Sequence, residues 1–121
     1  MLAPWNDSQP IYRQLRDRVI ALILDEILKD GDALPSVRAV AADYNVNPLT
    51  VSKAYQDLVD ENLVETRRGL GMFVLPGARD RLMDRERTRF LNEDWPPILE
   101  RIRRLGLDPD RLLNLQEGEP A

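Results

Sequence analysis

The chain has 121 residues, a formal net charge of −4, and neither cysteine nor histidine. Disulfides, thiolate zinc sites and histidine-based catalysis are therefore excluded. No apolar run approaches the ~20 residues that span a bilayer, and residues 1–7 lack the basic start and apolar core of a signal peptide, so we expect a soluble, cytoplasmic protein with one core and a small appendage.

A first helix is predicted within residues 8–30. Ser8 can cap it, with Pro10 in the first turn. Its apolar positions recur at helical spacing and form a wide stripe: Ile11, Leu15, Val19, Ile20, Leu22, Ile23, Leu24, Ile27 and Leu28. So wide a stripe is explained either by generous burial against the following helices or by a second contact, with the C-terminal segment or with another subunit. Trp5 is expected to pack against the body of the protein or against a partner subunit.

Two short helices joined by a tight turn are predicted between residues 36 and 60. Ser36 is a suitable N-cap for the first helix, and Asn45 can take the left-handed conformation that ends it. Asn47 can cap the second helix, with Pro48 at its first position, where a missing N–H costs nothing. Both helices have an apolar inner face at helical spacing: Val37, Val40, Ala41 and Tyr44 in the first, and Val51, Ala54, Tyr55, Leu58 and Val59 in the second.

The outer face of the second helix carries small, polar and basic side chains in its N-terminal half. Thr50 and Ser52 can donate hydrogen bonds to phosphates or base edges, and Lys53 can bind phosphate or guanine. Leu49 can contact a thymine methyl group. Arg38, in the first turn of the preceding helix, can contact a phosphate. The alternative interpretations are an ordinary amphipathic helix with a solvated face and a solvated surface arginine.

A β-hairpin is predicted after the second helix, with strands at residues 63–67 and 72–75. The glycines of Arg68-Gly69-Leu70-Gly71 permit positive φ in the turn between the strands. Arg67 and Arg68 place positive charge beside bare backbone at the tip, which suits a phosphate chain or a minor groove. This Gly-x-Gly is not a nucleotide-binding loop, because it joins two strands and opens no helix. Ala33-Leu34 is a short extended piece that can pair with the hairpin.

Short helices are predicted after Pro76-Gly77. Residues 79–92 alternate basic and acidic side chains, which is typical of a solvated helix face with salt bridges. Trp95-Pro96-Pro97 is expected to break that helix and start another, which Gly106 ends; Asp108-Pro109 then opens a last short helix. About 40 residues are too few to enclose a drug-sized pocket in one chain. We therefore expect the apolar stripes of this segment to pair with a second copy in an isologous dimer.

In their order and spacing, these motifs resemble the GntR family of bacterial transcription regulators over residues 9–77. The matching pieces are Pro10-Ile11-Tyr12, Gln14-Leu15, Gly31-Asp32, Leu34-Pro35-Ser36-Val37-Arg38, Val46-Asn47-Pro48, Thr50-Val51, Ala54-Tyr55, Leu58, Gly69-Leu70-Gly71 and Phe73-Val74. The short C-terminal tail resembles that of the YtrA subgroup. One departure is Asp25, which occupies the place of a family glycine near the end of the first helix. Aspartate can adopt the required conformation at some cost; the alternatives are that the helix runs longer or that it ends differently.

The resemblance implies a dimeric DNA-binding repressor or activator. Its implied DNA contacts are Ser36, Arg38, Asn47, Leu49, Thr50, Ser52, Lys53, Arg68 and Gly69, to which the charge pattern adds Arg67. The residues expected to read the base sequence are Asn47, Leu49, Thr50, Ser52 and Lys53, while Arg38, Arg68 and the Gly69 backbone position the module. The implied partners are double-stranded operator DNA with an inverted repeat, a second copy bound through the C-terminal helices, and an unidentified small effector if one exists.

The sequence thus predicts a mainly α fold with a small antiparallel β-hairpin. Residues 8–77 form a winged helix-turn-helix DNA-binding domain, and residues 78–116 form a helical dimerisation segment. We expect a transcription regulator, a repressor rather than an activator, with no enzymatic activity, no cofactor and no bound metal. The acidic net charge argues against DNA binding, but exposed charges beyond about 10 Å are largely screened at 0.1 M salt. The alternative function is a winged-helix module that binds proteins and no DNA.

Overall fold

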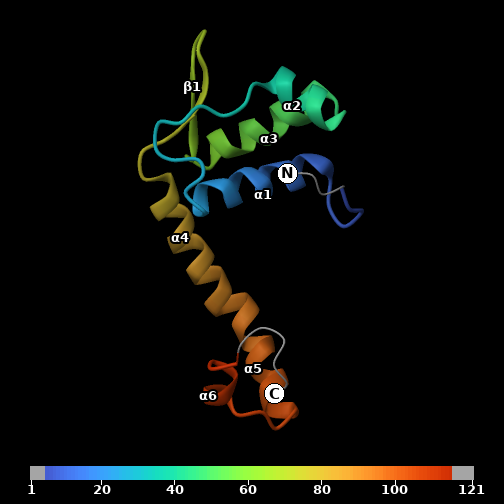
Figure 1. Ribbon diagram of the computed structural model, residues 1–121, viewed down its shortest axis with the longest axis vertical. Helices are drawn as coiled ribbons and strands as arrows, with labels where there is room; N and C mark the ends of the chain where they lie inside the picture. Colours follow the sequence, from blue (N-terminus) through green and yellow to red (C-terminus); the bar gives the residue numbers. More distant parts are fainter. Residues whose placement is uncertain (1–4, 116–121) are drawn as a thin grey trace. The chain divides into compact units, whose positions relative to one another are not determined.

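The computed structural model describes residues 5–115 and is mainly α-helical with one antiparallel β-hairpin (Figure 1). This confirms the predicted fold class. The elements are α1 (Ile11–Leu24), α2 (Val37–Tyr44), α3 (Pro48–Asp60), β1 (Val64–Arg67), β2 (Gly71–Val74), α4 (Ala78–Arg89), the π-helical segment η1 (Phe90–Asp94), α5 (Trp95–Arg104) and α6 (Pro109–Leu112). The chain divides into a first compact unit that ends at Met83 and a second that begins at Asp84.

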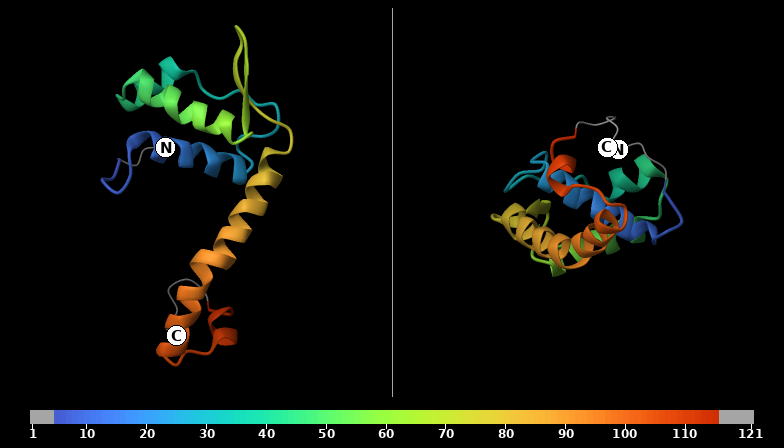
Figure 2. Two further views of the ribbon diagram at one scale, coloured as in Figure 1. Left: turned by 180° about the vertical axis from the view of Figure 1, so that it is seen from behind. Right: turned by 90° about the horizontal axis from the view of Figure 1, so that it is seen from below.

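The first unit is built around α3, whose inner face is completely buried. Val51, Ala54 and Leu58 expose none of their surface. α1 lies alongside α3, and α2 lies on the side of α3 that faces away from α1 (Figures 1 and 2). The same core takes side chains from α1, from the hairpin and from the start of α4: Leu15, Val19, Ile20, Ile23, Leu63, Val64, Val74, Ala78 and Leu82. Burial is worth about 25 cal/mol per Å² of apolar surface, so this cluster is the main source of stability in the unit.

The turn between α2 and α3 has the caps that the sequence predicts. Ser36 Oγ accepts a hydrogen bond from the N–H of Ala39 at 3.1 Å. Asn47 Oδ1 accepts one from the N–H of Leu49 at 2.9 Å. Asn45 has a φ of 53°, the left-handed conformation expected of it. The two caps satisfy N–H groups that have no partner inside their helices, and they fix where each helix begins.

Tyr55 ties α3 to the segment that precedes α2. It is 2% exposed, and its hydroxyl donates a hydrogen bond to the carbonyl of Pro35 at 2.7 Å. Burial raises the pKa of Tyr55 to about 12, because a buried phenolate would lose its hydration. The phenol therefore remains a donor at neutral pH, and it holds the start of α2 close to the middle of α3.

The hairpin has the predicted strands and turn. β1 and β2 pair along their whole length, and the N–H of Leu70 donates to the carbonyl of Arg67 at 2.9 Å. Gly69 has a φ of 78°, the positive value that the third position of a type II turn requires. Ala33 forms an isolated antiparallel bridge with Phe73. The expected pairing of the extended piece before α2 with the hairpin is therefore confirmed.

The start of α1 differs from the prediction. The helix begins at Ile11, after Pro10, and no side chain caps it. Ser8 lies before the helix, where its N–H donates to Asn6 Oδ1 at 2.9 Å. Gln14 is buried in α1, donates to the carbonyl of Asn6 at 2.8 Å and accepts from the Asn6 N–H at 3.0 Å. Ser8 is therefore not the predicted cap, because a buried glutamine amide holds the segment that leads into the helix.

Trp5 packs against the body of the first unit, which confirms one of the two alternatives stated for it. Its ring centroid lies 5.7 Å from that of Tyr44, at the end of α2. The guanidinium of Arg18, on α1, lies 4.0 Å above the Trp5 ring. The segment before α1 is thus fixed to both α1 and α2 by aromatic and cation–π contacts.

α1 is followed by a residue in the left-handed conformation, Glu26. α1 ends at Leu24, Asp25 has a φ of −82°, and Glu26 has a φ of 60°. The N–H of Ile27 donates to the carbonyl of Leu22 at 2.9 Å. This is the Schellman arrangement, in which the left-handed residue directly follows the C-cap. The left-handed residue is therefore Glu26 and not Asp25, so α1 ends differently from the family pattern, which is one of the alternatives left open for this segment.

The second unit contains a helix that continues where a break is predicted. The backbone passes from η1 directly into α5, with prolines of the Trp95-Pro96-Pro97 segment in the first turn of α5. Neither proline has an N–H to donate, so the helical backbone continues past them without the hydrogen bonds that those two positions would otherwise make. Gly106, with a φ of 67°, follows the end of α5. Asp108 accepts a hydrogen bond from the N–H of Asp110 at 3.0 Å and caps α6. These last two features are as predicted.

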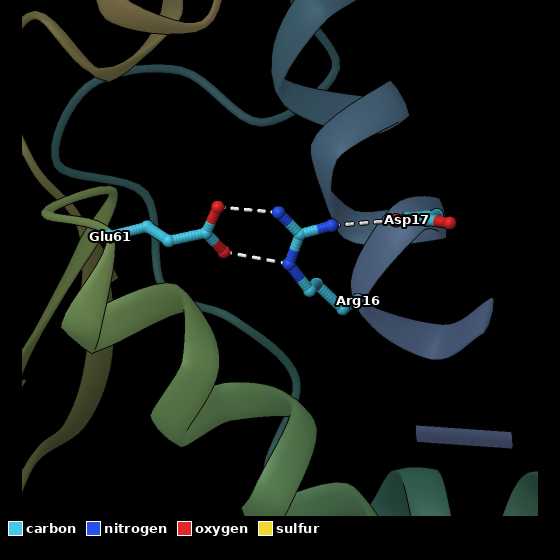
Figure 3. Close-up of polar contacts among 3 residues, drawn as sticks. All are labelled: Arg16, Asp17 and Glu61. Atoms are coloured by element: carbon cyan, nitrogen blue, oxygen red, sulfur yellow. Dashed lines mark hydrogen bonds and ion pairs between the residues drawn. The ribbon is translucent and has the colours of Figure 1, made fainter. Parts of the chain in front are cut away.

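An ion pair joins α1 to the end of α3 (Figure 3). Arg16 Nε donates to one carboxylate oxygen of Glu61 at 2.6 Å, and a second guanidinium nitrogen contacts the other oxygen. Asp17 accepts a further hydrogen bond from Arg16 at 2.7 Å. The hydrogen-bonded carboxylate of Glu61 raises the pKa of Arg16. Because a bidentate pair constrains angle as well as distance, it restrains rotation of α3 against α1.

We expect Arg16→Gln and Glu61→Gln each to lower the free energy of unfolding, and the double variant to lose less than the sum. A partly exposed bidentate pair should give a coupling of about 0.5–1 kcal/mol. The coupling should shrink at about 1 M salt, where charges are screened. Urea unfolding measures all three variants, with Arg13→Gln as a control on the same helix. If the double variant loses the sum of the two single losses at low salt, the ion pair contributes nothing to the free energy of unfolding.

Candidate nucleic-acid interface

The N-terminal half of α3 projects its outer face into solvent. Leu49 is 76% exposed although it is apolar, and Ser52 and Lys53 are exposed as well. Thr50 is half-buried at the edge of this face. The structure therefore brings the predicted positions 49, 50, 52 and 53 to one helix end. A helix end of this kind can enter a major groove, which is about 12 Å wide.

Ser36 and Asn47 each use one oxygen as a cap and keep donors for a ligand. Both side chains are exposed. While its oxygen accepts from the backbone, the Ser36 hydroxyl still has a proton to donate, and the Asn47 amide keeps its two N–H groups. Each residue lies at a helix N-terminus, where free N–H groups and the helix dipole attract anions. Arg38, exposed in the first turn of α2, adds positive charge beside Ser36.

The tip of the hairpin is accessible. Arg68, Gly69 and Leu70 are all exposed, Leu70 to 73%. A Cβ placed on Gly69 would meet no atom within 4 Å. The backbone there is open to a ligand from the outside, and the Arg68 guanidinium is free to follow a phosphate chain.

Arg67 differs from Arg68, although the sequence places both at the tip. Its Nε donates to Glu65 at 2.9 Å, and its guanidinium lies 4.2 Å above the ring of Phe73. A neighbouring carboxylate partly neutralises its charge. Arg67 therefore lies along the hairpin surface, and Arg68 is the main cationic side chain at the tip of the hairpin.

Sequence reasoning missed Tyr12, which meets the exposed face of α3 from α1. The ammonium of Lys53 lies 4.4 Å from the centroid of the Tyr12 ring, within cation–π range. Tyr12 stands out in the sequence only as part of Pro10-Ile11-Tyr12. Nothing in the sequence shows that it touches Lys53, because the contact depends on how α1 packs against α3.

The acidic residues of α3 lie away from this face, at its C-terminal end. Glu61 is paired with Arg16, and Asp60 accepts a hydrogen bond from Gln56 at 2.9 Å. The exposed N-terminal half, from residue 48 to residue 53, contains no carboxylate. The negative net charge of the chain is therefore not concentrated where the proposed ligand would bind.

Within residues 5–115, no group of three or more acidic side chains is placed to hold a metal ion. None of the helices in that range is long and apolar enough to cross a membrane.

Three helices followed by a hairpin, with the third helix exposed along one face, define a winged helix-turn-helix. The family model described as "Bacterial regulatory proteins, gntR family" matches residues 11–74. The chain therefore belongs to the GntR family. The resemblance noted in the sequence is thus confirmed. The protein is a DNA-binding transcription regulator, as predicted.

Relatives from Bacillus subtilis support this assignment. The HTH-type transcriptional repressor YtrA is 39% identical over 103 residues, which are 85% of this chain and 73% of the relative. An uncharacterised HTH-type regulator, YhcF, is 32% identical over 109 residues, with 90% and 88% of the two chains covered. A solved GntR-family regulator from Listeria monocytogenes superposes with a TM-score of 0.73 at 27% identity and covers 90% of this chain and 94% of its own. The predicted likeness to the YtrA subgroup is therefore confirmed.

We expect Ser36→Ala and Ser36→Gly to separate the two roles of the Ser36 hydroxyl. Alanine cannot cap, so it should lower the free energy of unfolding by about 1 kcal/mol, whereas glycine should cost only about 0.3 kcal/mol. Both variants lack the hydroxyl, so both should weaken DNA binding equally. Thermal unfolding and fluorescence anisotropy with a labelled duplex measure the two effects. Unchanged DNA binding by Ser36→Gly would leave the hydroxyl with the capping role alone.

Proposed function

We propose that this chain represses transcription as a homodimer that binds an inverted-repeat operator, with α3 in the major groove and the hairpin on the backbone or in the minor groove. The observation that carries the proposal is the exposed N-terminal half of α3. Leu49 is 76% exposed there, between polar and basic neighbours. A thymine methyl group is a natural partner for such a side chain. The description of Bacillus subtilis YtrA as a repressor supports the choice of repression.

The proposed contacts divide into those that read bases and those that position the domain. The base-reading set lies at the start of α3 and consists of Asn47, Leu49, Thr50, Ser52 and Lys53. The positioning set consists of Ser36, Arg38 and Arg68, with the backbone of Gly69 and a weaker charge contribution from Arg67. Phosphate contacts fix register and orientation, whereas contacts to base edges carry sequence information. A regulator of this kind acts on the chromosome, so we place it in the cytoplasm.

The exposed apolar side chains of the second unit support the proposed dimer: Phe90, Leu91, Ile98, Leu105 and Leu113. Within α5, only Ile102 is buried, so most of the apolar surface lacks cover inside the chain. A second copy would cover it across a two-fold axis. We therefore assign DNA binding to residues 8–77 and dimerisation to residues 78–116, the last of which lies outside the described range. A small effector, if one binds, would act at this interface.

The two-fold axis determines the form of the operator. Two half-sites in inverted orientation should lie about one helical turn apart, or about 34–36 Å. Selection of bound sequences from random DNA, with the purified chain near 0.15 M salt, tests this directly. Enrichment of an inverted repeat would support the proposal. A clean dimer that enriches no sequence would favour the alternative, a winged-helix module that binds proteins.

We expect Arg38→Ala to weaken binding to the selected operator and to random DNA by a similar factor, because phosphates carry no sequence. The slope of log affinity against log salt should fall by about 1 for each lost phosphate contact. Asp43→Ala, on the outer surface of the same helix, is the matched control and should not reduce the slope. Titrations at several salt concentrations provide the measurement. Loss of operator binding alone, with random DNA unaffected, would contradict the positioning role.

We expect Ile98→Lys to dissociate the dimer, because a charge would be buried without a partner in the apolar interface. Glu100→Lys places the same side chain at an exposed position of the same helix and should leave the dimer intact. Sedimentation velocity gives the oligomeric state, and operator affinity should fall with loss of the dimer. A monomeric parent chain, or a dimer unaffected by Ile98→Lys, would overturn the proposed interface.

A further inference from the structure

The contact between Lys53 and Tyr12 sets the direction of one cation on the exposed face of α3. Lys53 leaves α3 from that face, and Tyr12 lies in the first turn of α1. The Lys53 ammonium lies 4.4 Å from the centroid of the tyrosine ring. α1 runs along the side of α3 opposite α2 (Figures 1 and 2). The lysine is therefore drawn towards the α1 edge of α3 and away from the edge at which Arg38 lies.

No acidic side chain in the described part of the chain is paired with this ammonium. An aromatic ring attracts a cation without neutralising it. Fixing a free lysine side chain in one rotamer costs conformational entropy, and Tyr12 restricts the lysine before any ligand arrives. The protein thus holds an uncompensated positive charge in a defined place.

A helix in the major groove has a phosphate chain on each of its two sides. Arg38, on α2, lies towards one side of α3, and Lys53, held by Tyr12, lies towards the other. We infer that Tyr12 is a positioning residue that holds Lys53 against the phosphate chain on the α1 side of the groove. Lys53 then binds the DNA backbone and does not read guanine, which moves it from the base-reading set of the proposed function to the positioning set. This inference rests on the proposed insertion of α3 into the major groove.

The test is a double-mutant cycle with Lys53→Met, Tyr12→Leu and the combined variant. Each dimer is titrated with two labelled duplexes: the inverted repeat obtained by selection and a scrambled duplex of the same composition. Lys53→Met should weaken binding to both duplexes by the same factor and lower the salt slope by about 1 per subunit. Lys29→Met removes the same charge outside α3, and it should leave the slope unchanged.

The role of Tyr12 predicts coupling in this cycle. Tyr12→Leu should weaken binding to both duplexes by about two- to fivefold per subunit, and it should have no further effect once Lys53 is methionine. Tyr12→Phe keeps the ring and should bind DNA as the parent chain does. Thermal unfolding identifies any variant that fails to fold. If Tyr12→Leu does not fold, the contact is tested in the parent chain by the ring-current shift of the Lys53 ε-methylene protons. Absence of an upfield shift would overturn the inference.

The outcomes separate this inference from the proposed function. If the parent chain binds neither duplex, the proposed function fails and takes the inference with it. If the parent chain selects an operator but the Tyr12 and Lys53 variants weaken binding independently, only the inference fails. The same holds if Lys53→Met changes the preferred bases and leaves the salt slope intact, because Lys53 would then read a base.

Discussion

The complete burial of one face of α3 is the constraint on which the DNA-binding unit depends. Val51, Ala54 and Leu58 are packed without exposed surface against α1 and the hairpin. A helix has a fixed angular spacing of side chains, so fixing the inner face also fixes the direction of every residue on the outer face. The exposed positions of Leu49 and Ser52 follow from this packing and need no interactions of their own. Damage to the core would therefore misdirect the DNA-facing side chains even where they are unchanged.

The residues at the helix starts join folding to function through the same atoms. Ser36 and Asn47 accept backbone hydrogen bonds that begin α2 and α3, and their remaining donors face solvent. A cap that holds the backbone also limits the rotamers of its own side chain. The donors are thus oriented before DNA arrives, which reduces the entropy lost on binding. Because one side chain has both roles, few residue types suit these positions: a replacement must both cap the helix and donate a hydrogen bond.

Much of the first unit could be predicted because its determinants are local. Each cap bonds an N–H two or three residues away, and the hairpin turn needs positive φ at one glycine. The sequence did not predict local structure correctly where tertiary contacts or the exact hydrogen-bond register determine it. The buried amide of Gln14 replaces the expected Ser8 cap, and the hydrogen-bond register at the end of α1 makes Glu26 the left-handed residue, a point that the sequence left open. The exposure of the candidate site follows from helical spacing, whereas its contact with Tyr12 depends on a crossing of two helices that no local rule encodes.

The π-helical turn of η1 determines the direction in which the side chains that follow it point. Phe90 and Trp95 are five positions apart and stack with ring centroids 6.4 Å from each other. In a regular α-helix, residues with that separation point about 140° apart and cannot stack. The stacking of this aromatic pair therefore requires the π turn. If this turn took regular α geometry with the same number of residues, Trp95 would point about 140° away from Phe90, and Ile98 and Leu105 would turn with it. The π conformation of η1 consequently determines which apolar side chains share one face of the second unit.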